Sequence, residues 1–246
     1  MKPSAVVFGV GPRQGIGAEL CHRAAREGLH VFVSGRSAEK LEHVVTSICN
    51  EGGSAEALLA DVTVPQQVTA AAERIESSGS VLELAVYNAG NNRPEPFLDV
   101  TPEVFEDMWR VICMGGFLVG QAMVALMLQQ QTMARRQSLL FTGASASLRG
   151  KGNFAAFASG KGALRMLVQA IAREFGPQGI HVAHVIIDGV VEGEKVRTHF
   201  PEYIDRLGED GALRLEAIAD AYMALHAQER SAWTQELDLR PFKENY

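Results

Sequence analysis

The chain has 246 residues, of which 47% are hydrophobic, 21% charged and 7% aromatic, and its 23 basic and 29 acidic side chains give a formal net charge of −6. This size allows one large domain or two small ones, and the composition is typical of a globular protein, which argues against disorder and a fibrous repeat. The acidic balance, with Arg135-Arg136 as the nearest approach to a basic cluster, argues against nucleic acid as a partner.

The cysteines and histidines form no recognisable metal or disulfide pattern. Cys21, Cys49 and Cys113 are far apart, with no CxxC or zinc spacing, which favours a reducing compartment. His181 and His184 are three residues apart on an expected strand, so they point to opposite faces and predict no metal site. The N-terminus lacks the pattern of an export signal, so we expect a cytoplasmic protein.

Strand-length apolar runs alternate with helix-length segments along the chain. The apolar runs lie at 5–10, 30–34, 55–60, 82–87, 138–141 and 181–187, and the helical segments at 15–28, 38–51, 65–77, 102–129 and 154–175. Strands that are apolar on both faces and alternate with helices predict an α/β fold with a doubly wound parallel sheet. With no linker or compositional break, residues 1–246 are expected to form a single domain.

The first strand ends in a glycine-rich turn that opens a helix at once: Gly9-Val10-Gly11-Pro12-Arg13-Gln14-Gly15-Ile16-Gly17. Such a turn lets the backbone approach a pyrophosphate, whose charge then meets the helix N-terminus. We therefore expect a dinucleotide site that uses Gly11, Arg13, Gln14, Gly15 and Ile16. A tight turn without any ligand is the alternative interpretation.

The end of the second strand indicates which dinucleotide is bound. A site for NAD usually has an acidic residue there, which accepts hydrogen bonds from the ribose 2′-hydroxyl. Here glycine occupies that position and Arg36 follows it. A guanidinium suits the 2′-phosphate of NADP(H), with Arg13 as a second cation, so NADP(H) is preferred over NAD(H).

The most apolar helical stretch runs from Arg110 to Gln129, with Gln121 as its only polar side chain. It reaches the roughly 18 residues at which a membrane-spanning helix becomes a candidate, but aromatic belts and a lysine-rich flank are missing. We expect this helix to be buried by the sheet on one side and by a partner subunit on the other, with Leu118 and Met123 at the contact. The prediction is therefore a homodimer or homotetramer, with no membrane.

Farther along the chain, Asp61-Val62 follows the third strand, Asn88-Ala89-Gly90 ends the fourth, and Phe157 precedes Lys161 by four residues on the helix after the fifth. Together with the glycine loop, these motifs resemble the short-chain dehydrogenase/reductase family from Val6 to about Val191, while the last fifty or so residues match less clearly. The resemblance implies a Rossmann fold and hydride transfer between a nicotinamide cofactor and a small-molecule substrate.

The resemblance also implies roles for individual residues. Asp61 would accept from the adenine amino group and Val62 would flank the ring, while Asn88, Ala89 and Gly90 would line the cofactor cleft. Lys161 would hydrogen-bond the nicotinamide ribose. Gly189 and Val191 match the turn that holds the carboxamide, although Asp188 stands where the family has proline and Gly193 where it has threonine.

The residues of the family's proton chemistry are replaced. Phe157 occupies the position of the catalytic tyrosine, Ala144 that of its partner serine, and Ile112 that of the helix asparagine. A positioned general acid contributes about 10²–10⁴-fold and one hydrogen bond at a developing oxyanion about 10²–10³-fold, so the usual mechanism cannot operate unchanged. The chain is thus identified as an atypical member that lacks the catalytic Tyr and Ser.

Three interpretations of the site follow. In the first, the protein is an oxidoreductase with Lys161 and Ser145 as catalytic candidates, and the further proton donors that we consider are Tyr87, Asp188 and Glu192. In the second, the substrate is an activated double bond or an imine, which needs no alkoxide protonation. In the third, the protein binds NADP(H) without turnover.

The alternative to a catalytic role is a structural one: a backbone turn for Ser145 and Ser147, and a core position for Tyr87. For the C-terminal part we predict a charged segment at 193–208, followed by a helix at 213–226 and a strand at 233–239. The charged segment is either a mobile substrate lid or an ordinary surface excursion.

Overall fold

The structure, a computed structural model, describes residues 2–90, 92–130 and 135–244. Seven strands form one sheet in the order β3-β2-β1-β4-β5-β6-β7, and every neighbouring pair is parallel. The strands are β1 (Pro3–Phe8), β2 (His30–Gly35), β3 (Ser54–Leu59), β4 (Val81–Tyr87), β5 (Gln137–Thr142), β6 (Ile180–Ile187) and β7 (Glu236–Leu239). The predicted doubly wound parallel sheet is confirmed, and its strand order reverses between β1 and β4.

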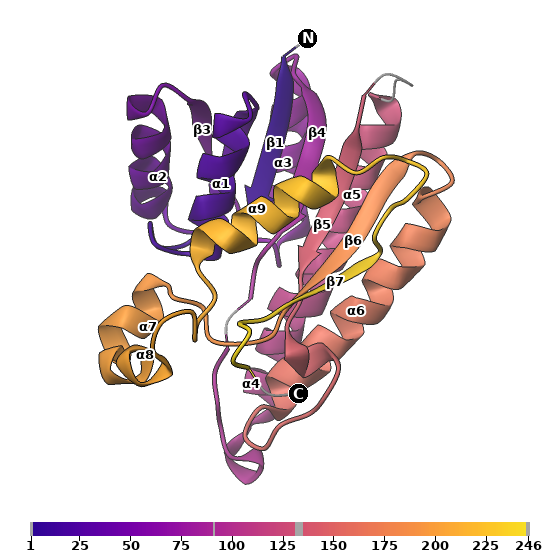
Figure 1. The fold of residues 1–246 in the computed structure, drawn as a ribbon. Coiled ribbons are helices and arrows are strands. Elements are labelled where there is room, and N and C mark those ends of the chain that lie inside the picture. The colour runs from indigo at the N-terminus through magenta and orange to yellow at the C-terminus, as the bar shows by residue number, and fades with distance from the viewer. Residues whose placement is uncertain (1, 91, 131–134, 245–246) are drawn as a thin grey trace.

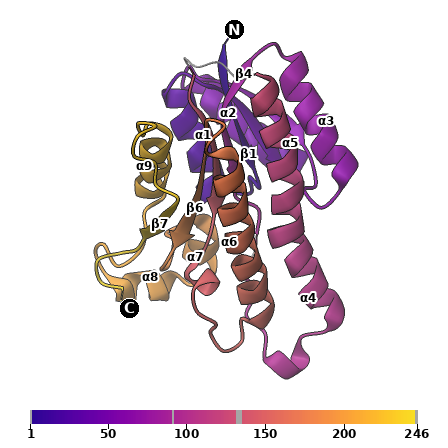
Figure 2. The same ribbon diagram turned by 90° about the vertical axis from the view of Figure 1, so that its right-hand side faces the viewer.

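Helices cover both faces of the sheet, as Figures 1 and 2 show from two sides. One face carries α1 (Ile16–Arg26), α2 (Ala38–Asn50) and α9 (Leu215–His226); the other carries α3 (Pro65–Ser77), α4 (Pro102–Trp109), α5 (Gly115–Gln129) and α6 (Ala155–Phe175). Short elements complete the fold: η1 (Phe97–Asp99), η3 (Ser145–Ser147), α7 (Glu194–His199) and α8 (Pro201–Leu207).

Alternation along the strands explains why the sheet is apolar on both faces. In β1, Ala5 and Val7 belong to the core under α1, α2 and α9, whereas Val6 and Phe8 belong to the core under α3, α5 and α6. Successive side chains of a strand point to opposite faces, so a strand covered on both sides reads as a continuous apolar run. Strands β1 to β6 therefore contribute to two separate cores, whereas the apolar residues of β7, Leu237 and Leu239, pack against only the first of them.

The long apolar segment is not one regular helix. Helix α4 passes into a π-helical turn, η2 (Arg110–Met114), and then into α5. Ile112 in this turn is fully buried and packs against Gly160 of α6, where a Cβ on the glycine would lie 3.1 Å from the isoleucine Cβ. π-Helical turns are frequent at functional sites.

By length and composition alone, Pro102–Gln129 is the one helix in the described part of the chain that could cross a membrane. Its most apolar 18-residue window has a mean hydropathy of 2.1, and half of that window is buried inside the protein. The buried half contacts α3, β4 and α6, as expected for a core helix of a folded domain.

The C-terminal part differs in detail from the prediction. The charged segment at 193–208, for which no helices were predicted, forms α7 and α8, and the amide of Glu194 donates to the carbonyl of Gln14 at 2.8 Å. The last strand begins at Glu236 rather than at 233, because Trp233 instead stacks on His181 with ring centroids 4.8 Å apart. A lid function for α7 and α8 stays a prediction.

Apolar side chains remain exposed on α4, α5 and α6; in Figure 2, α4 and α5 follow each other end to end and α6 runs alongside them. Phe105, Phe117 and Met166 are exposed there by 39%, 42% and 53%. The expectation for Met123 was wrong, because α5 turns this side chain into the core, where it is fully buried; Leu118 is half-buried. The exposed face, rather than Met123, is the surface on which a partner subunit would pack.

The first prediction concerns this face. Phe117→Glu should convert a dimer or tetramer into monomers or aggregates while the protein still folds, because the side chain is exposed in the single chain. Thr46→Glu, on the exposed side of α2 across the sheet, is the matched control and should leave assembly unchanged. Light scattering at micromolar concentration checks both, and a monodisperse wild-type monomer would contradict the prediction.

Candidate active site

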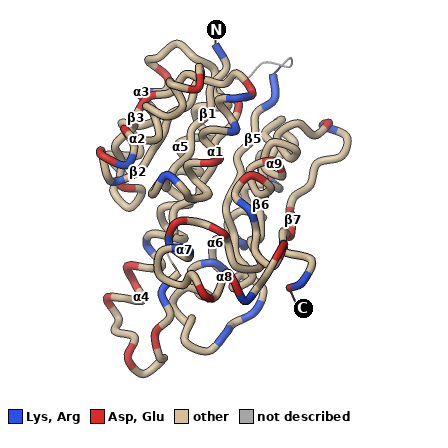
Figure 3. The backbone as a smooth tube through the Cα atoms, turned by 60° about the vertical axis from the view of Figure 1, so that its left-hand side comes forward, with Lys and Arg blue, Asp and Glu red and all other residues tan. Residues whose placement is uncertain are grey.

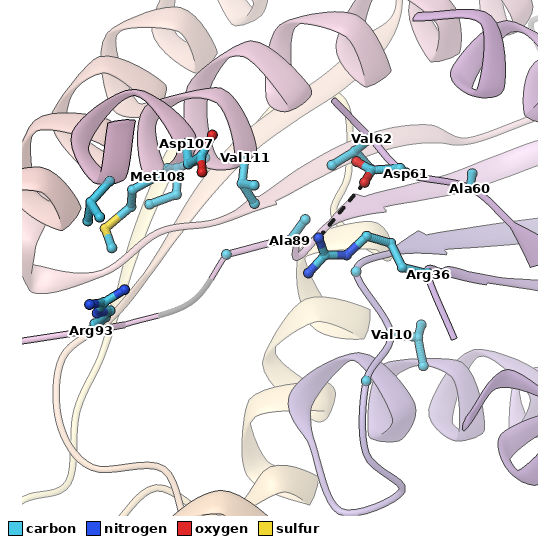
Figure 4. A pocket seen from close by; sticks show the side chains of 16 residues that line it. Val10, Arg36, Ala60, Asp61, Val62, Ala89, Arg93, Asp107, Met108 and Val111 are labelled. Atoms are coloured by element: carbon cyan, nitrogen blue, oxygen red, sulfur yellow. Dashed lines mark ion pairs between the residues drawn. The ribbon is translucent and has the colours of Figure 1, made fainter. Parts of the chain in front are cut away.

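Two cavities lie at the carboxyl edge of the sheet, beside the point where the strand order reverses. One of about 350 Å³ extends from the glycine loop past Arg36 and Asp61 (Figure 4), and one of about 680 Å³ extends past Lys161 toward α7. Both are lined by Gly9, Gly11 and Gly90, so they meet at the glycine loop. Ligands of open parallel sheets bind in this place.

The glycine loop leaves its backbone open to a ligand. Gly9 has a φ of +89°, and a Cβ there would overlap the backbone nitrogen of Ala89, so only glycine fits. A Cβ on Gly11, by contrast, would have no atom within 4 Å. Gly15 then begins α1 without a side-chain cap, which leaves the first amides of an 11-residue helix available. This loop fits a pyrophosphate.

The smaller cavity holds an arginine and a carboxylate that face each other. Arg36 is 72% exposed, and its Nη1 lies 3.8 Å from Oδ2 of Asp61, as the dashed line in Figure 4 marks. The other oxygen of Asp61 accepts from the amide and the hydroxyl of Thr63 at 2.9 and 2.7 Å. Burial raises the pKa of Asp61, but the Thr63 hydrogen bonds and Arg36 outweigh it and lower the pKa overall.

The structure places Arg13 away from Arg36. Its guanidinium donates to the Ser47 hydroxyl at 3.4 Å and lines a separate polar cavity on the α1 side, together with Gln14, Glu192 and Arg197. The two predicted phosphate-binding arginines therefore flank the glycine loop from different cavities. Gln14 also lines the larger cavity.

Asn88 joins the ends of three strands. Its Nδ2 donates to the carbonyl of Gly9 at 3.1 Å, and its Oδ1 accepts from the Thr142 hydroxyl at 3.0 Å. That hydroxyl lies 2.7 Å from the Tyr222 hydroxyl of α9. Asn88 thus fixes the cleft wall at the ends of β1, β4 and β5, and sequence reasoning gave no sign of Thr142 or Tyr222 because they are far away in the chain.

Lys161 is the central titratable group of the larger cavity. Its side chain comes from the first half of α6, is 4% exposed, and donates from Nζ to the carbonyl of Thr142 at 2.6 Å. Burial lowers the pKa of this amine to about 8. Phe157 lies one turn earlier with its ring centroid 5.8 Å from Nζ, and a Cβ on Gly90 would lie 3.6 Å from Nζ.

The side chains at positions 112, 144 and 157 are apolar. Phe157 is 9% exposed, Ile112 is fully buried, and both belong to the same core cluster, against which Ala144 packs. None of these three side chains has a hydrogen-bond donor or acceptor. Of the three, Phe157 has its ring beside the Lys161 amine, with the centroid 5.8 Å from Nζ.

The surroundings of Tyr87, Glu192 and Ser147 show whether these residues reach the larger cavity. Tyr87 is fully buried and its hydroxyl donates to the backbone carbonyl of Val111. Glu192 pairs with Arg197 at 2.6 Å and does not line the Lys161 cavity. Ser147 donates to the carbonyl of Ala144 at 2.7 Å, which is the turn role expected for it.

Ser145, by contrast, is half-buried and lines the larger cavity together with Lys161. Its backbone carbonyl accepts from the amides of Leu148 and Arg149, which fixes the short η3 helix. Ser145 and Lys161 thus line the same cavity, and a role in proton transfer stays a prediction for both.

The carboxylate of Asp188 is buried and paired with two arginines. Its carboxylate is 3% exposed and lies 3.0 Å from Nη2 of Arg149 and 3.0 Å from Nη2 of Arg240. The next residue, Gly189, has a φ of +147° and faces Pro241, and Val191 forms a bridge with Leu213. Sequence reasoning missed Arg149 and Arg240, because neither is near Asp188 in the chain.

The profile of the short chain dehydrogenase family matches residues 5–201. The chain therefore belongs to the short-chain dehydrogenase/reductase family, as the fold and the motifs along the cleft indicate.

Individual relatives agree with this assignment. A crystal structure of a short-chain dehydrogenase from Rhodopseudomonas palustris is 36% identical, has a TM-score of 0.80, and is matched over 98% of this chain and 99% of that one. The short-chain reductase protein NovJ of Streptomyces niveus is 31% identical, over 84% of this chain and 74% of NovJ. The uncharacterized oxidoreductase YuxG of Bacillus subtilis (strain 168) is 30% identical over 74% of this chain. YuxG is a much longer protein, and the matched region covers 26% of its length.

The second prediction uses the pKa of Lys161. Because this pKa is lowered to about 8 in the folded protein, the unfolded chain binds more protons above pH 8, and stability should rise with pH up to about 10.4. Relative to Lys161→Met, wild-type protein should gain up to about 3 kcal/mol over that interval. Urea unfolding of both proteins at pH 7.5 and pH 10 measures the difference.

The exposed Lys151→Met variant is the control and should follow the pH dependence of wild type. A stability difference between wild type and Lys161→Met that stays constant from pH 7.5 to pH 10 would show that this amine is not buried as described.

Proposed function

We propose that the protein is an NADP(H)-dependent oxidoreductase in which Lys161 and Ser145, instead of a tyrosine and its partner serine, serve proton transfer to a small-molecule substrate. The observation that supports this most is the buried Lys161 amine with a pKa of about 8, which lines the larger cavity beside Ser145. A general acid is most effective when its pKa lies near the working pH.

The described cleft suits a dinucleotide along its whole length. The adenine end would lie beside Asp61, Val62 and Ala89, with Arg36 at the 2′-phosphate. The pyrophosphate would lie at the amides that run from Gly11 to Ile16. The nicotinamide end would extend into the larger cavity, between Gly90, Lys161 and the turn at 189–191. Bound NADPH supplies a hydride.

The chain's own contribution is the proton. When a carbonyl carbon accepts a hydride, its oxygen becomes an alkoxide and takes one proton. The Lys161 ammonium gives up that proton readily because burial favours the neutral amine. The Thr142 carbonyl still accepts a hydrogen bond from Nζ, which keeps the side chain in place. The Ser145 hydroxyl would donate to the same oxygen, as an oxyanion donor does.

A second candidate function rests on the apolar replacements. Phe157, Ala144 and Ile112 offer no proton or hydrogen bond, and an NADP(H)-binding protein without turnover would need none. A substrate with an activated double bond or an imine would likewise need no alkoxide protonation. The experiments below separate these functions.

The third prediction concerns the cofactor. Arg36→Ala should weaken NADPH binding about tenfold, because one charge-assisted hydrogen bond to the 2′-phosphate contributes about 1.5–3 kcal/mol and the exposed guanidinium is screened by solvent. NADH binding should change little. Calorimetric titration with each cofactor measures both constants.

The matched control for the cofactor experiment is Arg74→Ala, an arginine that is 48% exposed and paired with Glu56 outside the cleft. It should leave both dissociation constants unchanged. Equal wild-type affinities for NADPH and NADH would contradict the assignment of Arg36 to the phosphate.

The fourth prediction separates an enzyme from a binding protein. In the proposed enzyme, wild type oxidises NADPH with some member of a panel of aldehydes, ketones, quinones, enones and imines, and Lys161→Met abolishes this turnover. Phe157→Tyr with Ala144→Ser should then add little, because Lys161 and Ser145 already supply the proton and the hydrogen bond. Absorbance of NADPH at saturating substrate follows the reaction.

In a pure binding protein the results reverse. Wild type shows no turnover on the panel, Lys161→Met only weakens NADPH binding, and the double variant gains carbonyl reduction because Lys161 is still present beside the new tyrosine. Full activity in Lys161→Met would mean that the active site lies elsewhere.

A further inference from the structure

Beyond Lys161, the larger cavity has a wall that carries a half-exposed arginine. Arg149 follows η3 in the connection from β5 to α6, and its amide donates to the carbonyl of Ser145 at 3.1 Å. The backbone therefore makes one turn from Ser145 to Arg149, and both residues line the same cavity. The Arg149 side chain remains 48% exposed.

The guanidinium of Arg149 is held at one end by a buried carboxylate. Nη2 donates to both oxygens of Asp188, at 3.0 and 3.3 Å. Nε and Nη1 make no hydrogen bond to any residue that the structure describes. Because an arginine presents five N–H donors in a planar fork, the anchored side chain keeps donors for a second anion.

Asp188 has a second cationic partner besides Arg149. Arg240 lies 3.0 Å from the same carboxylate, and its side chain is 13% exposed. A buried carboxylate needs a cationic partner. Arg240 supplies one from the interior, and its Nη2 is shared between Asp188 and Asp238, which lies 2.5 Å away. Arg149 is thus the partner on the cavity side, and its removal would leave the Asp188–Arg240 pair in place.

We infer that Arg149 binds a carboxylate of the substrate, so that the substrate is an oxo acid whose reducible carbonyl lies at Lys161 and whose carboxylate lies at Arg149. This inference rests on the proposed function for its carbonyl and on the contacts of Arg149 for its carboxylate. A positioned guanidinium binds a carboxylate through charge-assisted hydrogen bonds, which fix the orientation of the molecule as well as adding affinity.

Neighbouring side chains favour one negative charge with an apolar body. Lys151 lines the same wall, with Nζ 5.9 Å from the centroid of the Phe154 ring, and Phe154 and Phe157 give the cavity aromatic surface. Glu194, Lys195 and Glu244 also line the cavity, from segments after β6. The cations of the lining, Arg149, Lys151, Lys161 and Lys195, exceed its carboxylates, Asp188, Glu194 and Glu244, by one charge. A monoanionic carboxylate is therefore favoured over a doubly charged phosphate.

The test uses three matched pairs of carbonyl compounds: 4-formylbenzoate, phenylpyruvate and 4-oxopentanoate, each with its methyl ester. Wild type in complex with NADPH should bind or reduce at least one acid about tenfold better than its ester, the effect of one charge-assisted hydrogen bond. Arg149→Met should remove this preference by weakening the acid, with the ester unchanged. Calorimetry gives the affinities and NADPH absorbance gives kcat/KM.

The control is Arg197→Met. This arginine has a similar exposure (57%), pairs with Glu192, and lines the separate polar cavity beside Arg13 rather than the larger cavity. The control variant should keep the preference for the acid. Thermal unfolding of both variants checks that they fold, and the comparison of acid with ester in wild type alone tests the inference even if Arg149→Met does not fold.

The outcomes separate the inference from the proposed function. Equal binding of acids and esters by a wild type that binds NADPH overturns the carboxylate site and leaves the oxidoreductase assignment intact. Failure to bind NADPH refutes the proposed function, and calorimetry of the acids on the free protein still decides whether Arg149 binds a carboxylate. Loss of the preference in Arg197→Met as well would overturn the role of Arg149.

Discussion

Parallel pairing of β1 with β4, where the strand order reverses, is the constraint on which the rest of the site depends. It brings the ends of both strands so close that Gly9 cannot carry a side chain beside Ala89. Asn88 then ties the end of β4 to Gly9 and, through the Thr142 hydroxyl, to β5. The backbone of Thr142 in turn receives the amine of Lys161. One strand pairing therefore positions the glycine loop, the cleft wall and the lysine.

Three apolar side chains in the region of Lys161 come from three different elements. Ile112 comes from the π-helical turn, Phe157 from α6 and Ala144 from the end of β5, and all three are apolar. A tyrosine or an asparagine in such surroundings would leave a buried polar group that needs a partner. Burial lowers the pKa of the nearby Lys161 amine to about 8.

Charge is arranged differently at the two ends of the cleft. Arg36 is exposed and meets a carboxylate that Thr63 already holds, so its guanidinium is free to turn toward a ligand. Arg149 is anchored on a buried carboxylate that has a second cation behind it. A mobile cation suits a phosphate at the rim, and an anchored one suits a group whose orientation must be fixed. Figure 3 shows that basic and acidic residues are otherwise interspersed over the backbone.

The sequence by itself determined the parallel sheet, the glycine loop and the identity of the residues at 112, 144, 157 and 161, because each depends on local periodicity or on spacing within one motif. Tertiary structure decided which of the suggested proton donors line the cavity, since Tyr87 and Glu192 are excluded only by their surroundings. It likewise turned Met123 inward and joined Asp188 to Arg149 and Arg240. These contacts join residues far apart in the chain, and their free energy depends on burial and on long-range pairing, which no local pattern encodes.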